Sequence, residues 1–144
     1  MTEQYGVYHV GLKALFRRGN SVLLLRDATT GRIDLPGGRI NQDEVHTSIE
    51  DALKREIREE LGANITYTLQ GPLFQFRRAN REGSAMVFIT VYGAEYTDGT
   101  IELSDEHSSY EWVDPTTVEF QESDFGNTEE TQAMNAYLQS MNIA

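Results

Sequence analysis

The segment at residues 48–61, SIEDALKREIREEL, constrains the fold most, because it combines a clear helical pattern with an unusual placement of acidic side chains. Ser48 followed by Asp51 resembles a capping box, and Gly62 suits the first position after a helix. At ~100° per residue, one arc of this helix is apolar. The arc is marked by Ala52, Leu53, Ile57 and Leu61. The segment therefore predicts an amphipathic helix packed against a core.

Three glutamates near the end of this helix conflict with its local physics. Glu56 and Glu60 fall inside the apolar arc, and Glu59 lies at its border. Negative charge near a helix C-terminus is unfavourable by ~0.3–1 kcal/mol per group, and a carboxylate sheltered from water needs an opposite charge. Arg55 reaches Glu59 but neutralises only part of the cluster. An ordinary solvated face is the alternative, which the helical wheel disfavours. A hard divalent cation, Mg²⁺ or Mn²⁺, would remove these penalties.

Composition narrows the class of protein and of partner. A chain of 144 residues predicts one domain over residues 1–144. The net charge of -11 argues against a nucleic-acid polymer as partner, because surplus lysine and arginine normally bind phosphate backbones. Without cysteine, any metal must be held by oxygen or imidazole ligands. No apolar run reaches the ~20 residues of a membrane span, and the start lacks a signal peptide, so we expect a cytoplasmic protein with no membrane partner.

The rest of the chain reads as strands and one further helix. Strands are expected at residues 8–18, 21–27, 33–35, 64–70, 73–79, 85–96 and 110–115. A second helix is expected at residues 128–141, where one stripe is formed by Ala133, Met134, Tyr137, Leu138 and Met141. Strands that enclose one central and one C-terminal helix predict a mixed α/β (α+β) sandwich.

Two stretches resemble the signature of the Nudix hydrolases. That signature is glycine, five residues, glutamate, seven residues, and then R-E-U-x-E-E-x-G-U with U an aliphatic residue. Gly38 and Glu44 match its first half. The second half is matched by Arg55, Glu56, Ile57, Glu59, Glu60 and Gly62. The flanking LPGG, VLLLRD and YEWVDP agree, so the resemblance covers most of the chain.

The first half of the signature is altered. Ten residues rather than seven separate Glu44 from Arg55, which places VHTS in a loop about one helical turn longer. Seven residues separate Thr47 from Arg55, as the signature requires, but threonine cannot replace a carboxylate. Glu44 is therefore the candidate for the family's first carboxylate.

The resemblance implies an α/β/α sandwich with a mixed sheet, and Mg²⁺-dependent hydrolysis of a pyrophosphate bond, with Mn²⁺ as a substitute. The substrate would be a nucleoside diphosphate linked to another moiety, either a nucleoside triphosphate or a nucleotide sugar. Glu56, Glu59 and Glu60 would bind the metal beside Gly38, and Arg55 would orient them. Glu56, Glu59 and Arg55 are thus also the expected catalytic residues.

The remaining site candidates rest on fewer observations. Glu106 is the candidate general base, because relatives often carry an extra carboxylate in this loop, with Asp105 as a weaker substitute. For the neighbouring His107 we expect no role, since the sequence fixes no partner for it. Candidate substrate-binding residues are the cations Arg26, Arg39, Arg77 and Arg78 and the aromatic Phe76, with Tyr8 and Tyr92 as further stacking candidates.

Two rival functions stay open. A dinucleoside polyphosphate hydrolase would use the same chemistry on another substrate. A non-catalytic Nudix-fold sensor would bind a nucleotide without cleaving it, and the longer loop is one route to such a loss. Retention of Glu56, Glu59 and Glu60 argues against the sensor. The resemblance leaves a homodimer open as well.

Overall fold

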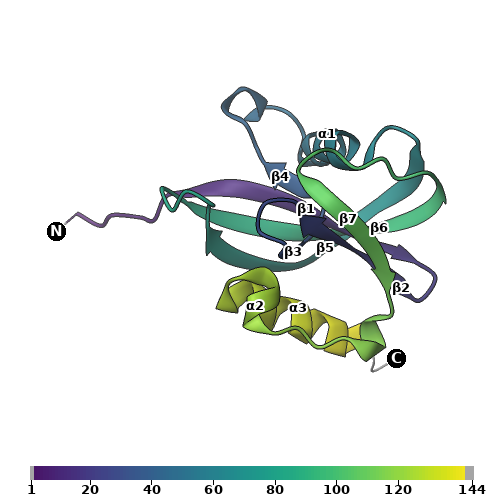
Figure 1. The fold of residues 1–144 in the computed structure, drawn as a ribbon. Coiled ribbons are helices and arrows are strands. Elements are labelled where there is room, and N and C mark those ends of the chain that lie inside the picture. Colours follow the sequence, from purple (N-terminus) through teal and green to yellow (C-terminus); the bar gives the residue numbers. More distant parts are fainter. Residues whose placement is uncertain (1, 142–144) are drawn as a thin grey trace.

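A mixed sheet forms the centre of the structure, a computed structural model that describes residues 2–141. Its strand order is β3-β2-β1-β6-β5, with β4 paired to β1 and β7 paired to β2 (Figure 1). β1 and β6 run parallel, and the other pairs are antiparallel. The strands are β1 Tyr8–Arg18, β2 Ser21–Asp27, β3 Ile33–Asp34, β4 Gly37–Arg39, β5 Ile65–Ala79, β6 Met86–Gly99 and β7 His107–Val113.

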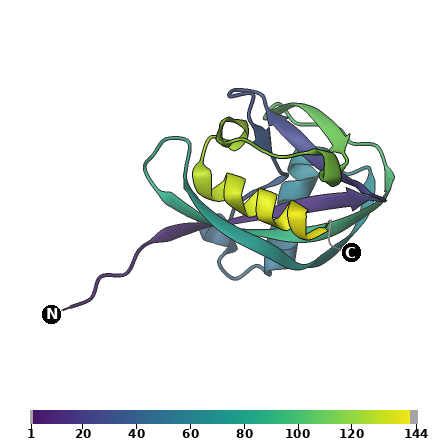
Figure 2. The same ribbon diagram turned by 90° about the horizontal axis from the view of Figure 1, so that it is seen from below.

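Helices cover both faces of this sheet. α1, Ile49–Leu61, lies on one face, and α2, Glu122–Phe125, and α3, Thr128–Met141, lie on the other (Figures 1 and 2). Two short 3₁₀ helices, η1 at Gln42–Glu44 and η2 at Pro115–Thr117, sit in connections. This arrangement confirms the predicted α/β/α sandwich. Among residues 2–141, no helix has the length and apolar character that a bilayer crossing requires.

Two apolar layers hold the helices to the sheet, because alternate side chains of one strand point to opposite faces. Leu15 of β1 joins Met134 and Leu138 of α3 in one layer. Phe16, the next residue of β1, joins Leu53 and Ile57 of α1 in the other. Each fully buried side chain of this size contributes roughly 1.5–3 kcal/mol to folding. α1 is thus fixed against the sheet by its apolar arc.

The ends of α1 are set by its predicted caps. The Ser48 side chain accepts a hydrogen bond from the Asp51 amide at 3.1 Å. Gly62, with φ 87°, ends the helix and donates its amide hydrogen to the Arg58 carbonyl. The four residues of the apolar arc, Ala52, Leu53, Ile57 and Leu61, are all buried. The predicted helix is confirmed, and it begins one residue later than expected because Ser48 is its cap.

Other boundaries differ from the prediction for identifiable reasons. The two strands expected at residues 64–70 and 73–79 are one strand, β5, whose register shifts around Pro72. Proline is tolerated there because β5 lies at the edge of the sheet. β7 begins at His107, before the expected residue 110. β4 was not predicted, because its glycine pair reads as a turn.

Leu53→Ala should lower the free energy of unfolding by ~2–5 kcal/mol, since it leaves a cavity in the layer under α1. Leu53 is 1% exposed, whereas Ile49 of the same helix is 49% exposed. Ile49→Ala is therefore the matched control, with an expected change within ~0.5 kcal/mol. Urea denaturation measures both. Equal losses for the two variants would contradict this packing of α1.

Candidate active site

Two glycines allow β4 to approach β1 and α1 closely. Gly37 has φ 144°, and an added Cβ there would lie 2.0 Å from the Leu12 carbonyl oxygen. An added Cβ on Gly38 would lie 2.6 Å from the Glu56 carboxyl group. Any side chain at Gly38 would therefore displace Glu56, which accounts for glycine at the position predicted to border the metal.

Arg55 orients three members of the acidic cluster, which consists of Glu44, Glu56, Glu59 and Glu60. Its Nε donates to Glu44 at 2.6 Å, and its Nη2 donates to Glu44 at 2.7 Å and to Glu56 at 2.9 Å. Its Nη1 donates to both carboxylate oxygens of Glu59 at 3.1 Å, so the predicted contact between Arg55 and Glu59 is confirmed. One guanidinium group thus orients three carboxylates.

Glu44 reaches this network in spite of the longer loop. It ends η1, and its Oε1 also accepts a hydrogen bond from the Asn41 amide at 3.0 Å. The Arg55 hydrogen bonds lower the pKa of Glu44, which keeps it ionised. The additional residues are accommodated between η1 and α1. Glu44 therefore supports the cluster through Arg55.

Glu60 is the most sheltered acid of the cluster. Its side chain accepts a hydrogen bond from the Gly37 amide at 2.6 Å, and the residue is only 5% exposed. Burial raises the pKa of Glu60 to about 8. Burial also raises the pKa of Glu56, although Arg55 opposes that shift. Glu59 differs, because its side chain is 58% exposed. A cation would favour the ionised form of both sheltered carboxyl groups.

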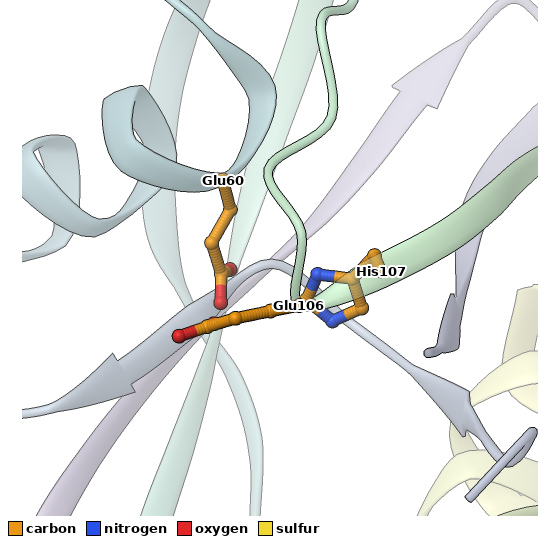
Figure 3. Close-up of side chains that lie close together, drawn as sticks. All are labelled: Glu60, Glu106 and His107. Carbon is orange, nitrogen blue, oxygen red and sulfur yellow. The ribbon is translucent and has the colours of Figure 1, made fainter. Parts of the chain in front are cut away.

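Two other potential metal ligands lie close to Glu60. Glu60, Glu106 and His107 each offer one potential ligand atom, and these three atoms lie within 4.8 Å of one another. Figure 3 shows the Glu60 side chain extending from α1 towards the other two residues, which stand at the start of β7. The structure thus brings the predicted base Glu106 to the C-terminal end of the acidic helix.

His107 is the residue that sequence reasoning missed. It is 5% exposed, and its Nε2 lies 3.0 Å from a carboxylate oxygen of Asp34. The other carboxylate oxygen of Asp34 accepts from Lys13 Nζ at 2.8 Å. Although burial opposes it, Lys13 and His107 hold the pKa of Asp34 well below its usual range. The Asp34 carboxylate in turn raises the pKa of His107 against the effect of burial. Nothing in the sequence indicated that β7 begins at His107, and this start of the strand places the side chain in the interior.

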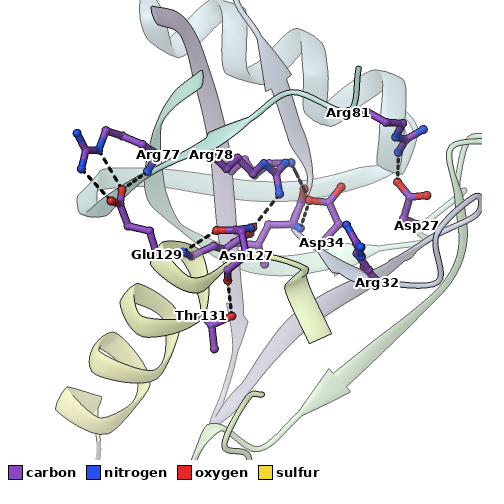
Figure 4. A network of polar contacts seen from close by, with 12 residues as sticks. Asp27, Arg32, Asp34, Arg77, Arg78, Arg81, Asn127, Glu129 and Thr131 are labelled. Carbon is purple, nitrogen blue, oxygen red and sulfur yellow. Dashed lines mark hydrogen bonds and ion pairs between the residues drawn. The ribbon is translucent and has the colours of Figure 1, made fainter. Parts of the chain in front are cut away.

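Two predicted substrate-binding arginines contact α3 (Figure 4). The Arg77 guanidinium binds Glu129 at 2.9 Å, and the Arg77 amide donates to the same carboxylate at 2.5 Å. Arg78 binds the buried Glu130 at 2.8 Å. These contacts fix both side chains near the first turn of α3, and a role in substrate binding stays a prediction.

The other substrate-binding candidates are spread over the molecule. Arg26 donates to the Gly31 carbonyl at 3.1 Å, and Arg39 lies 3.0 Å from Nδ1 of His9. Phe76 and Arg77 line one hollow of about 460 Å³ between β5 and α3. The rest of its lining is Gln75, Phe88, Glu129, Gln132 and Ala133, none of which belongs to the acidic cluster.

The acidic cluster fits a divalent cation. Glu60 and Glu106 each offer a carboxylate oxygen and His107 offers an imidazole nitrogen in a small volume, and the hard cations Mg²⁺ and Mn²⁺ take such oxygen ligands. Gly38 leaves the space beside Glu56 free of a side chain. A divalent cation held by such carboxylates keeps open positions for water and for phosphate oxygens.

The comparisons with known proteins agree with this geometry. No curated protein matches the chain. A solved MutT protein from Methanosarcina mazei Go1 is 25% identical with a TM-score of 0.76, covering 99% of this chain and 100% of that one. A MutT NUDIX hydrolase from Burkholderia pseudomallei is 23% identical with a TM-score of 0.71, covering 91% and 98%. An ADP-ribose pyrophosphatase from Streptococcus suis is 17% identical with a TM-score of 0.63, covering 96% and 94%.

The family model described as the NUDIX domain matches residues 7–133. That match includes every strand, the acidic helix α1 and the start of β7 with Glu106 and His107. The chain therefore belongs to the NUDIX family of hydrolases.

Proposed function

We propose that the protein is a Mg²⁺-dependent pyrophosphohydrolase, with Mn²⁺ as a substitute, acting on a nucleoside diphosphate linked to another moiety. The observation that carries this proposal is the convergence of Glu60 and Glu106, which come from different elements, at one point beside His107. Glu56 lies near enough to Glu106 for their charges to interact, and Arg55 orients both Glu56 and Glu59. A small phosphorylated substrate with bound cations suits this acidic site, because the cations reverse its local charge.

Each side chain has a distinct task in this proposal. Glu56, Glu59 and Glu60 would hold the divalent cation, and Arg55 keeps two of them in fixed orientations. The cation, when bound, withdraws charge from phosphate oxygens and acidifies a water molecule. Glu106 is exposed and can accept the proton of the water that attacks phosphorus. The attack breaks the bond between phosphorus and the bridging oxygen, and the second phosphate group leaves with that oxygen.

The substrate is proposed to be a nucleoside triphosphate or a nucleotide sugar. Arg77 borders the hollow between β5 and α3 and is its candidate phosphate contact, whereas Phe76 is 2% exposed and offers little ring surface for stacking. Glu129 would have to share Arg77 with such a phosphate. A dinucleoside polyphosphate would require the same catalytic groups, so only a substrate comparison separates these classes.

A screen of nucleoside triphosphates, nucleotide sugars and dinucleoside polyphosphates, each with Mg²⁺ and with Mn²⁺, should find at least one compound that is hydrolysed. Release of phosphate or pyrophosphate is the measurement. Turnover of none of them, together with clear binding of a nucleotide, would overturn the enzymatic proposal and favour the sensor.

Glu59→Gln should reduce turnover of the substrate so identified by roughly 100-fold or more, with little change in stability, because the exposed Glu59 contributes little to packing. Glu50→Gln is the matched control, since Glu50 lies on the same helix and pairs only with Lys54 among the described ion pairs of α1. Its turnover should stay at the wild-type value. Wild-type turnover for Glu59→Gln would refute its role as a ligand.

Glu60→Gln should change the pH dependence of stability of the metal-free protein. The pKa of Glu60 is raised from its ordinary 4.5 to about 8 on folding, so the unfolded chain releases this proton first as the pH rises. The contribution of Glu60 to the free energy of unfolding therefore falls between pH 4.5 and about 8. The glutamine variant lacks this loss. From pH 5 to pH 8, its free energy of unfolding should therefore fall less than that of the wild type.

Urea denaturation in the presence of a chelator, at pH 5 and at pH 8, compares the wild type with Glu60→Gln. Glu50→Gln again serves as control, because an exposed carboxylate should not alter the difference between the two pH values. A wild type and a Glu60→Gln variant with the same pH dependence would show that Glu60 is not a sheltered carboxyl group.

A further inference from the structure

We propose that Glu60, Glu106 and His107 form a divalent-cation site in which Nδ1 of His107 is a direct ligand. A nitrogen ligand would make this site prefer Mn²⁺, and transition metals generally, over Mg²⁺. The inference rests on the proposed function and deepens it, because it assigns a ligand role and a metal preference to His107, for which the sequence predicted no role. Glu106 would bind the cation through one carboxylate oxygen and keep the other for the proton of the attacking water.

The spacing of the three groups suits a common ion. Ligand atoms ~2.1 Å from one ion lie at most ~4.2 Å apart. The candidate atoms of Glu60, Glu106 and His107 lie within 4.8 Å of one another, so modest side-chain movements bring all three into range. Figure 3 shows the His107 ring and the Glu106 side chain close to the Glu60 carboxyl group.

The hydrogen bond between His107 and Asp34 leaves one ring nitrogen free. Nε2 lies 3.0 Å from Asp34, and Asp34 is held as a carboxylate by Lys13 at 2.8 Å. A carboxylate at this distance accepts the Nε2 proton and thereby directs the lone pair to Nδ1. Metal-binding histidines almost always donate their second nitrogen to a carboxylate or carbonyl in this manner.

The state of Nδ1 of His107 is a second, independent observation that indicates a ligand. Among the described residues it is buried and has no hydrogen-bond partner, and the whole residue is 5% exposed. A buried polar atom left without a partner costs ~1–3 kcal/mol. A purely structural histidine that serves only to hold Asp34 gives no account of this atom. A metal ion within reach of Glu60 and Glu106 does.

The nitrogen ligand sets the metal preference. Mg²⁺ strongly favours oxygen ligands and keeps several of its waters, whereas first-row transition-metal ions accept imidazole, Mn²⁺ less strongly than the later ions. We expect the wild type to bind Mn²⁺ at least tenfold more tightly than Mg²⁺. Loss of the imidazole should reduce Mn²⁺ affinity by ~10–100-fold, and Mg²⁺ affinity by less.

The direct test is pulsed electron paramagnetic resonance of Mn²⁺ bound to the full chain without nucleotide. Echo-envelope modulation from a coordinated ¹⁴N nucleus is expected in the wild type and should be absent in His107→Gln. His46→Gln, which changes an exposed loop histidine, is the matched control and should keep the modulation. Bound Mn²⁺ without nitrogen modulation in the wild type, or with unchanged modulation in His107→Gln, would overturn the inference.

A second variant keeps the test decisive if His107→Gln does not fold. The chain has three histidines, so the double variant of His9 and His46 to glutamine leaves His107 as the only one. Both replaced side chains are exposed. Retained nitrogen modulation in this double variant assigns the ligand to His107, and its loss overturns the inference.

Calorimetric titration of Mn²⁺ and Mg²⁺ into the same proteins measures the preference. Because these measurements use no substrate, they separate the inference from the proposed function. Hydrolysis by a wild type that shows no nitrogen ligand would leave the function intact and overturn the inference. A nitrogen ligand in a protein that hydrolyses no compound would support the inference and overturn the proposed function.

Discussion

The hydrogen bond from the Gly37 amide to the Glu60 carboxyl group joins the two parts of the molecule on which the site depends. It is 2.6 Å long and buried, and it connects the start of β4 to the last turn of α1. The apolar layer under α1 fixes the helix, but this bond fixes where its acidic end meets the sheet. A carboxyl group that a helix would ordinarily expose is thereby held in a sheltered position, where its charge requires a partner.

Arg55 extends that arrangement to the longer loop. By contacting Glu44, Glu56 and Glu59 at once, it makes the position of three carboxylates depend on one planar group. A loop of a different length can therefore still place Glu44 in contact with Arg55. Spacing in the sequence is therefore a weaker guide to this contact than the chemistry of the groups, because a loop can change its path while its end remains tied to Arg55.

Helices α1 and α3 and the first two strands were predictable because their patterns are local. The caps Ser48 and Gly62, and the aliphatic residues and tight turn of β1 and β2, need no knowledge of the rest of the chain. The acidic edge of α1 was predictable for the same reason. His107 was not, because its environment consists of Asp34 and Glu60, which are distant in sequence. The continuity of β5 through Pro72 was also missed, since it depends on β5 being an edge strand.

The contact between α3 and the outer strand has a consequence for the behaviour of the protein at high concentration. An edge strand presents unpaired amide groups to which another molecule can add a strand. On β5 the Arg77 amide is already bound by the Glu129 carboxylate, and the Arg77 side chain closes over the same group. The negatively charged helix α3 thus covers the edge of the sheet at Arg77 of β5. Another molecule would have to displace this helix before it could pair a strand there.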